Sequence, residues 1–111
     1  MVLIESEVAV YHDEGSFGMT YTVKPTTKFR KDLKLCQKRG YNIQAITDVI
    51  KMLAKGMALP EKFHDHQLTG NLKNCRECHI APDWLLVYEI SNTELILYLT
   101  RTGTHSDLFG K

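Results

Sequence analysis

The fold is decided by the stretch Arg76-Glu77-Cys78-His79-Ile80-Ala81-Pro82-Asp83-Trp84-Leu85-Leu86-Val87-Tyr88. A polar strand that carries His79 reaches a break at Pro82, and an apolar run over residues 84–88 follows the break. The length of this run and its aromatic and β-branched content predict a buried strand. Polar residues at the end of a strand project from a rigid frame toward solvent or a cleft. Because Asp83 and Trp84 lie at this break, we expect a functional site there.

The segment before this stretch predicts a short strand and a helical hairpin. The strand covers residues 20–24 and is ended by Pro25. A helix then begins at Thr26 or Thr27 and runs to about residue 39, with apolar residues three or four positions apart on one face. Asn42 caps a second helix that ends near Gly56. The connection is so short that the two helices must be antiparallel.

The second half of the chain predicts a run of strands. Residues 57–74 form a loop with, at most, one short strand near Leu68. Strands follow at about residues 75–80, 84–90 and 94–102, and residues 91–93 join the last two as a tight hairpin. The resulting order is strand, helix, helix and three strands. It predicts an α+β domain in which the helical hairpin packs on a mostly antiparallel four-stranded sheet.

The 111 residues divide into an acidic N-terminal segment and a basic domain. Residues 1–18 carry four acidic residues and no Lys or Arg, so the remainder holds 14 basic and nine acidic residues, a net charge of +5. A complete domain pattern begins directly after Met19. We therefore expect residues 1–18 to be an N-terminal extension, disordered or not native, and residues 19–111 to form one domain. Lysines at positions 28, 31 and 34 make the first helix a candidate phosphate-binding face, although such a face is more often only solvated.

Cysteine count and hydropathy indicate where the protein works. The three cysteines are an odd number and a poor framework for disulfides, so we expect a cytoplasmic location. No apolar run approaches the ~20 residues of a membrane helix, so no membrane partner is expected.

The pattern Cys75-x-x-Cys78-His79 raises the question of a bound metal or haem. Haem attachment would imply export, for which the chain carries no signal. A zinc site completed by His64 or His66 is the stronger metal alternative, yet cysteines three apart on a strand point to opposite faces. We therefore interpret these cysteines as small buried side chains and expect neither a metal ion nor another cofactor.

Histidines near strand ends suggest acid–base chemistry. Histidine titrates near neutrality, and an arginine fork suits a phosphate that gains charge in a transition state. Two aromatic residues, Trp84 and Phe109, are candidates for stacking on bases, although Trp84 is nearly as well explained as ordinary core. Together these are the parts of a metal-free ribonuclease.

Three blocks of sequence support this interpretation through a resemblance. They are Asp65-His66-Gln67-Leu68-Thr69-Gly70, the opening stretch from Arg76 to Trp84, and Arg101-Thr102-Gly103-Thr104-His105-Ser106-Asp107-Leu108-Phe109. From residue 21 to 109 the chain resembles the YafQ branch of the RelE/ParE toxin superfamily, the mRNA interferases of bacterial toxin–antitoxin pairs. The resemblance implies the strand and helix order given above, with a short C-terminal helix. It places the catalytic positions on His66, His79, Asp83, Arg101, His105 and Phe109, with Trp84 adjacent.

The resemblance also implies an activity and its partners: cleavage of mRNA in the A site of the 70S ribosome, and inhibition by a cognate antitoxin. In the expected reaction the RNA 2′-OH attacks its own phosphate. Asp83 or His66 is the base, His105 the acid, and Arg101 steadies the phosphorane. His79 orients the phosphate and Phe109 holds a base. Two alternatives remain: a ParE-like gyrase inhibitor, which shares the fold without the histidines, and a non-catalytic RNA- or partner-binding module.

Overall fold

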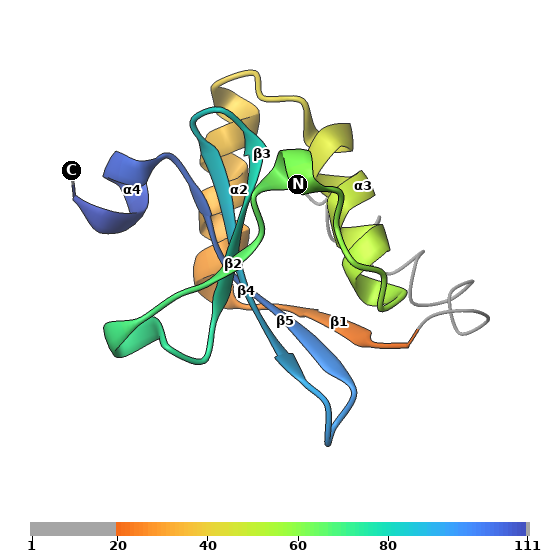
Figure 1. The fold of residues 1–111 in the computed structure, drawn as a ribbon. Coiled ribbons are helices and arrows are strands. Elements are labelled where there is room, and N and C mark those ends of the chain that lie inside the picture. The colour runs from red at the N-terminus through yellow and green to blue at the C-terminus, as the bar shows by residue number, and fades with distance from the viewer. Residues whose placement is uncertain (1–19, 111) are drawn as a thin grey trace.

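The computed structural model describes residues 20–110, which form one twisted sheet with two long helices on one face and a short helix near one edge (Figure 1). The predicted division between residues 1–18 and the domain lies outside the described residues. None of the helices within residues 20–110 has the length and apolar character needed to cross a bilayer.

The sheet has five strands in the order β1-β5-β4-β3-β2. Their bounds are β1 Thr22–Pro25, β2 His66–Gln67, β3 Arg76–Ala81, β4 Trp84–Ser91 and β5 Ile96–Gly103. Strand β1 pairs parallel to β5, and every other pair is antiparallel. The predicted α+β class with a mostly antiparallel sheet is therefore confirmed. The fifth strand, β2, has two residues and begins just before the short strand expected near Leu68.

The helical hairpin forms as its caps predict. Helix α2 spans Thr27–Lys38 and α3 spans Ile43–Ala54. The hydroxyl of Thr26 accepts a hydrogen bond from the Phe29 N–H, and the Asn42 side chain accepts one from Gln44 N–H. The structure thus selects Thr26 rather than Thr27 as the first cap.

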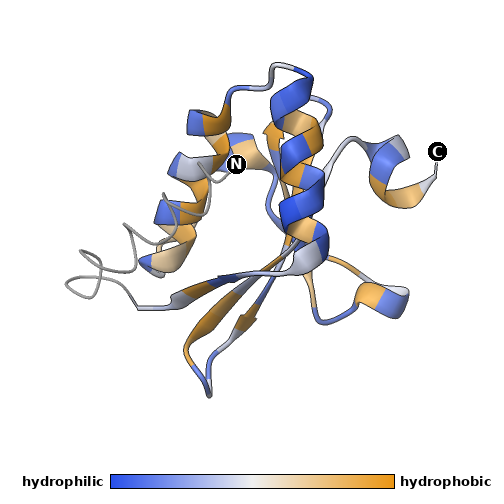
Figure 2. Cartoon of the chain, turned by 180° about the vertical axis from the view of Figure 1, so that it is seen from behind, coloured by the Kyte–Doolittle hydropathy of each residue, from blue (hydrophilic) through white to orange (hydrophobic). Residues whose placement is uncertain are grey.

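The core lies between this hairpin and one face of the sheet. Phe29 and Leu33 of α2 and Ile46 of α3 are fully buried against strand residues such as Leu86 and Leu97. In Figure 2 the apolar side of α3 is turned toward the sheet. Truncating Phe29 to Ala would leave a cavity here and cost about 3–5 kcal/mol.

Several strand boundaries differ from the sequence prediction by one or two residues. The β4–β5 connection covers residues 92–95, one residue more than the expected turn over 91–93, and Leu95 within it adopts a left-handed conformation with φ 57°. The sequence offers no glycine at this position to signal such a turn. Strand β1 also continues through Pro25, which suits a residue at the end of an edge strand because it lacks an N–H to donate.

Candidate active site

The candidate residues gather on the sheet face that the long helices leave uncovered. His66 of β2 lies opposite Glu77 of β3, Glu77 lies opposite Val87 of β4, and Val87 lies opposite Arg101 of β5. Directly opposite residues in a sheet share a face, so these four side chains form one row across four strands. His79 lies two residues after Glu77 and therefore points to the same side.

A β-bulge turns Arg101 toward this row. The register shifts between Val87, which pairs with Arg101, and Tyr88, which pairs with Leu99, and this leaves Thr100 as the extra residue. Leu97 and Leu99 point into the core under the helices. Without the extra residue, strict alternation along β5 would turn the Arg101 side chain into that core as well.

Asp32 of α2 fixes the Arg101 guanidinium. The Nε and Nη2 atoms of Arg101 donate to the two Asp32 carboxylate oxygens at 2.7 and 3.1 Å, and the Thr102 N–H donates to Asp32 Oδ2 at 3.1 Å. The hydrogen bond to Asp32 raises the pKa of Arg101, which therefore stays charged. Asp32 is the one acidic residue among the basic residues of α2, and no sequence pattern pairs it with Arg101.

Three histidines meet at the β2–β3 side of the row. The rings of His64 and His79 are 5.6 Å apart between centroids in an edge-on arrangement, and those of His66 and His79 are 6.4 Å apart. His66 Nδ1 donates to the His64 carbonyl oxygen at 2.8 Å, and its Nε2 lies 3.2 Å from Glu77 Oε1. This arrangement gathers several proton carriers around one patch of the sheet.

Glu77 is the site residue that sequence reasoning missed. Its side chain is buried on a strand, at 4% exposure, and within residues 20–110 its Oε2 atom has no hydrogen-bond partner. An unpaired buried carboxylate oxygen is costly, and a catalytic role is one reason for a protein to keep one. The available signal was a single acidic residue inside a predicted strand, directly before Cys78-His79.

The loop that carries His64 and His66 is tied to the sheet through Asp65. Arg76 donates from Nε and Nη2 to Asp65 Oδ2 at 3.2 and 3.0 Å, and the Tyr88 hydroxyl donates to Asp65 Oδ1 at 2.5 Å. Burial, together with the bond to Asp65, raises the pKa of Tyr88, so its hydroxyl stays protonated. These contacts hold the backbone between the two histidines against β3 and β4.

Helix α4, His105–Phe109, carries the remaining candidates at the end of β5. Its first turn is closed by a capping box, in which Thr104 Oγ1 accepts from the Asp107 N–H and Asp107 Oδ2 accepts from the Thr104 N–H. The two Nη atoms of Arg39 donate to the Asp107 carboxylate at 2.6 and 3.1 Å, and this contact holds the pKa of Asp107 well below its usual range. His105 and Phe109, both exposed, have ring centroids 5.5 Å apart.

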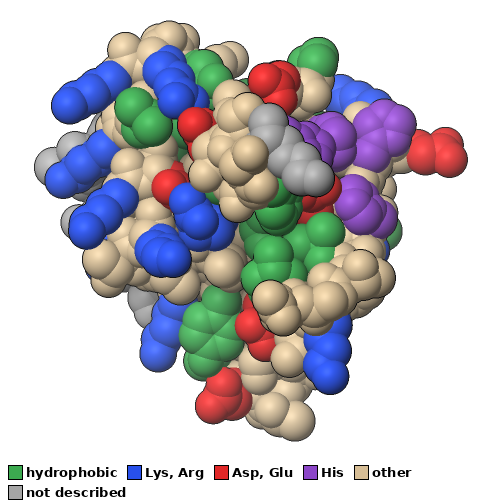
Figure 3. Space-filling model, turned by 90° about the vertical axis from the view of Figure 1, so that its left-hand side faces the viewer, with side chains coloured by type: hydrophobic (Ala, Val, Ile, Leu, Met, Phe, Trp, Pro, Cys, Tyr) green, Lys and Arg blue, Asp and Glu red, His purple; other side chains and the backbone are tan. Residues whose placement is uncertain are grey.

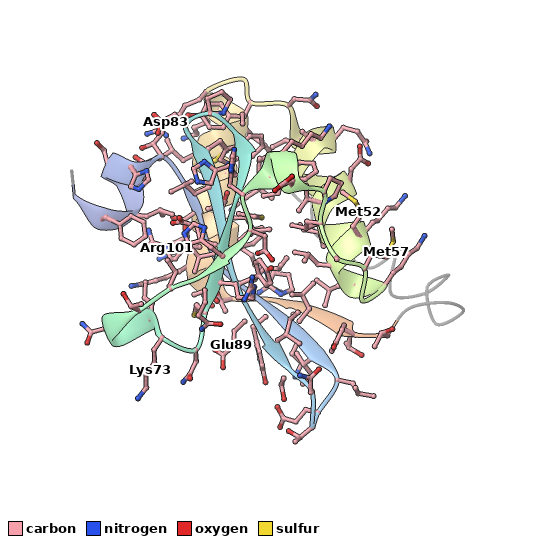
Figure 4. All side chains as sticks on the ribbon, in the orientation of Figure 1. Met52, Met57, Lys73, Asp83, Glu89 and Arg101 are labelled. Carbon is pink, nitrogen blue, oxygen red and sulfur yellow. The ribbon has the colours of Figure 1, made fainter. Side chains whose placement is uncertain are left out.

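The structure brings most of the predicted residues together. His66, His79 and Arg101 lie on the shared face, and His105 and Phe109 follow on α4 at the end of β5. Asp83 is exposed in the β3–β4 turn, whereas Arg101 lies along β5 toward α4 (Figure 4). Lysines 28, 31 and 34 are all exposed on α2. Figure 3 shows the histidines at one side of the molecular surface and a band of Lys and Arg at the other.

Trp84 occupies a different environment from the other candidates. It is 4% exposed, its Nε1 donates to Thr102 Oγ1 at 2.8 Å, and its ring packs edge-on against Tyr41 at 4.9 Å. A buried ring offers no open face to a nucleobase. Trp84 therefore supports the β3–β4 turn from the core side, and we leave it out of the RNA-stacking proposal below.

The cysteines of the Cys-x-x-Cys pattern are buried thiols. Cys78 is fully buried, and burial raises the pKa of its thiol to about 12. Cys75 is 6% exposed, and its pKa is also raised, chiefly by burial. The thiolate is the form that binds metals, so these environments disfavour ligation. Within residues 20–110 no three His, Cys, Asp or Glu side chains are arranged as a metal site.

Comparisons with known proteins find relatives over almost all of the described domain. A family model described as a bacterial toxin of a type II toxin–antitoxin system, YafQ, matches residues 21–110. The mRNA interferase toxin YafQ of Escherichia coli K12 is 38% identical over 84 residues, which cover 75% of this chain and 89% of the relative.

Solved structures agree with this family. The toxin in the crystal structure of the E. coli DinJ–YafQ toxin–antitoxin complex matches with a TM-score of 0.75 and 33% identity, over 83% of this chain and 100% of that one. A metal-bound toxin from Helicobacter pylori matches with a TM-score of 0.75 and 44% identity, over 82% and 99% of the two chains.

Proposed function

The chain belongs to the YafQ family of toxins from bacterial type II toxin–antitoxin systems, and on that premise we propose that it is an mRNA interferase, an endoribonuclease that cleaves messages in the ribosomal A site. The observation that carries the proposal is the row of His66, Glu77 and Arg101 on the sheet face that the long helices leave uncovered, with His105 on α4 at the end of β5. A ParE-like gyrase inhibitor would not need these histidines, and a passive binding module would not need a buried, unpaired carboxylate.

The proposed reaction is attack of an RNA 2′-OH on the adjacent phosphorus. The 2′-oxygen forms a bond to phosphorus while its proton passes to a base, and the P–O5′ bond breaks as His105 donates a proton to the leaving oxygen. The products are a 2′,3′-cyclic phosphate and a 5′-hydroxyl end. Arg101, held by Asp32, stabilises the phosphorane, and a fixed charge of this kind contributes about 10²–10³ in rate. His79 orients the phosphate, and Phe109 stacks on a base.

The base is His66 or Asp83, and the contacts of His66 indicate which of its nitrogens would act. Its Nδ1 donates to a carbonyl oxygen, so Nε2, which lies 3.2 Å from Glu77 Oε1, is the nitrogen that would take the RNA proton. The Glu77 carboxylate would then stabilise the imidazolium that forms. Asp83 is exposed at the β3–β4 turn and would act without Glu77.

We further propose that the ribosome and an antitoxin are the protein partners. The exposed lysines of α2 provide a positive surface suited to ribosomal RNA. The DinJ–YafQ complex is a toxin bound to its antitoxin, and a free nuclease with an exposed site would harm its own cell. An antitoxin with an acidic, amphipathic segment would complement the basic body of this chain. The cell compartment proposed is the cytoplasm, where ribosomes translate messages.

To test this proposal, messages are translated in a bacterial extract with and without the purified protein, and the message ends are then mapped. New ends should appear only on translated messages, and they should persist when free metal is chelated within the ribosome's own magnesium requirement. The chelator experiment is needed because the H. pylori relative is a metal-bound toxin. Stoichiometric metal in the purified protein, lost together with cleavage, would refute the metal-free mechanism. Uncleaved messages in the presence of folded protein would refute the activity itself.

A further inference from the structure

A cleft opens beside the histidine cluster, on the flank away from β5. It lies between the short 3-10 helix η1, Glu61–Phe63, and the end of β3 with the turn that follows. Its volume is about 730 Å³, which is within the range of small-ligand sites. Phe63, Ile80 and Pro82 form an apolar wall, and Lys62, His64 and His79 supply polar groups.

His79 belongs to both the cleft and the proposed catalytic face. Its ring contacts those of His64 and His66 and also lines the cleft. Helix α4, with Phe109, packs at β5, whereas η1 packs at β3, two strands away. Two strand spacings amount to about 10 Å. An RNA whose scissile phosphate lies between Arg101 and His79 therefore has one neighbouring nucleotide at Phe109 and the other at the cleft.

The lining favours a nucleotide over a purely apolar ligand. The Lys62 ammonium lies 5.2 Å from the centroid of the Phe63 ring, so a positive charge stands beside an aromatic face. Aromatic and apolar surfaces accept the flat face of any base, and a cation beside them attracts the phosphate. An apolar group alone would remove Lys62 and two imidazoles from water without giving them partners, which is costly.

We infer that this cleft, lined by Lys62, Phe63 and His79, is a subsite for one nucleotide adjoining the scissile phosphate of the RNA. It is separate from the Phe109 side and fixes the message on the opposite flank. The inference rests on the proposed function because it takes RNA as the substrate. Nucleotide binding in the cleft can be measured without the ribosome, so a failure to bind can be told apart from a failure to cleave messages.

The test is an NMR titration of the full chain with 2′-O-methyl homotrinucleotides of each base, which the protein cannot cleave because the attacking hydroxyl is blocked. Saturable amide shifts are expected at residues 62–64 and 79–81. Lys62→Gln should weaken binding by about two- to fivefold, the effect of one exposed charge contact. Phe63→Leu should weaken it by about tenfold through loss of one stacking face.

Lys73→Gln is the matched control, since it removes the same charge from an exposed position that does not line the cleft (Figure 4). It should leave binding unchanged. Phe63 is half-buried, so the thermal midpoint of Phe63→Leu is measured as well, whereas exposed Lys62 can change without affecting the fold. Shifts confined to other residues, no saturable binding, or equal affinities for Lys62→Gln and Lys73→Gln would overturn the subsite. Nucleotide binding in the cleft without message cleavage in translation extract would instead overturn the proposed function.

Discussion

Arg101 and His105 are four residues apart in the chain, yet different contacts position them. The bulge at Thr100 and the Asp32 carboxylate place Arg101, whereas His105 depends on the capped first turn of α4. Each side chain is at the surface or only partly covered. Removing either should therefore affect chemistry far more than stability.

Arg101→Ala and His105→Ala should each reduce message cleavage by about 10²-fold or more, the usual loss for a fixed charge or a general acid. The measurement is the cleavage rate in translation extract beside the thermal midpoint of each variant. Cys78→Ala is the control, with a slightly lower midpoint and nearly normal cleavage. Normal rates in the first two variants and an inactive Cys78→Ala would move the chemistry to the cysteines.

Glu77→Gln tests which residue is the base. A glutamine side chain carries no charge to stabilise the imidazolium that forms when His66 takes the RNA proton, so cleavage should fall by about 10²-fold or more if His66 is the base. Asp83→Asn is the matched change of carboxylate to amide at the turn. Rates are compared at several pH values, with the thermal midpoint as a check on folding. An active Glu77→Gln and an inactive Asp83→Asn would assign the base to Asp83.

Helix α4 has five residues, too few to be stable by itself in water. Its capping box closes its own first turn, and the Arg39–Asp107 ion pair joins it to the end of α2. Gly103, just before it, has φ 152°, and a Cβ added there would lie 2.8 Å from Asp107 Oδ2. The position of His105 and Phe109 therefore depends on Asp107.

This dependence predicts a loss of α4 order in acid. The pKa of Asp107 is lowered in the folded protein. Its contribution to the stability of α4 is therefore fully present above the ordinary aspartate pKa of about 3.9 and is lost as the pH falls below that value. The amide shifts of residues 104–109, followed by NMR as the pH is lowered, should change as α4 loses its order. Asp107→Asn should already show the altered shifts at neutral pH and cleave more slowly. Unchanged shifts in Asp107→Asn would mean that other contacts hold α4.

The helices and strands could be predicted from sequence because each depends on local signals. Thr26 and Asn42 mark helix starts, and the run after Asp83 has the length of a buried strand. The bulge at Thr100 has no such signal, since it is defined by how β5 registers against β4. The partnership of Asp32 with Arg101 and of Glu77 with His66 also required the fold, because each joins residues distant in sequence. Trp84, expected near RNA, lies in the core because alternation along β4 places it with Leu86 and Tyr88.

Across the molecule, the basic residues of α2 and the candidate catalytic residues lie on different surfaces. The histidines gather at one side of the molecule and a band of Lys and Arg at the other (Figure 3), and Lys28, Lys31 and Lys34 are exposed along α2. The proposed cleavage on the ribosome needs both surfaces: one to bind structured RNA, and another to reach the message. The α2 lysines should therefore affect binding rather than the chemical step.

Replacing Lys28, Lys31 and Lys34 together by Gln should weaken ribosome binding and reduce the slope of log affinity against log salt by about two to three, one ion for each lost contact. Affinity is measured by sedimentation with 70S ribosomes at several salt concentrations. Lys73→Gln, the single-site control, should change the slope by less than one. A triple variant with an unchanged slope would show that α2 faces solvent in the bound state.

The proposed mechanism makes the RNA 2′-OH the nucleophile, so removal of that single hydroxyl should abolish cleavage. A message is prepared with a single 2′-deoxynucleotide immediately 5′ of the mapped scissile phosphate, and it is translated beside the all-ribose message with the wild-type protein. We predict that cleavage at that site disappears while the all-ribose message yields a 2′,3′-cyclic phosphate end. Equal cleavage of the two messages, or a 3′-hydroxyl end, would contradict the mechanism.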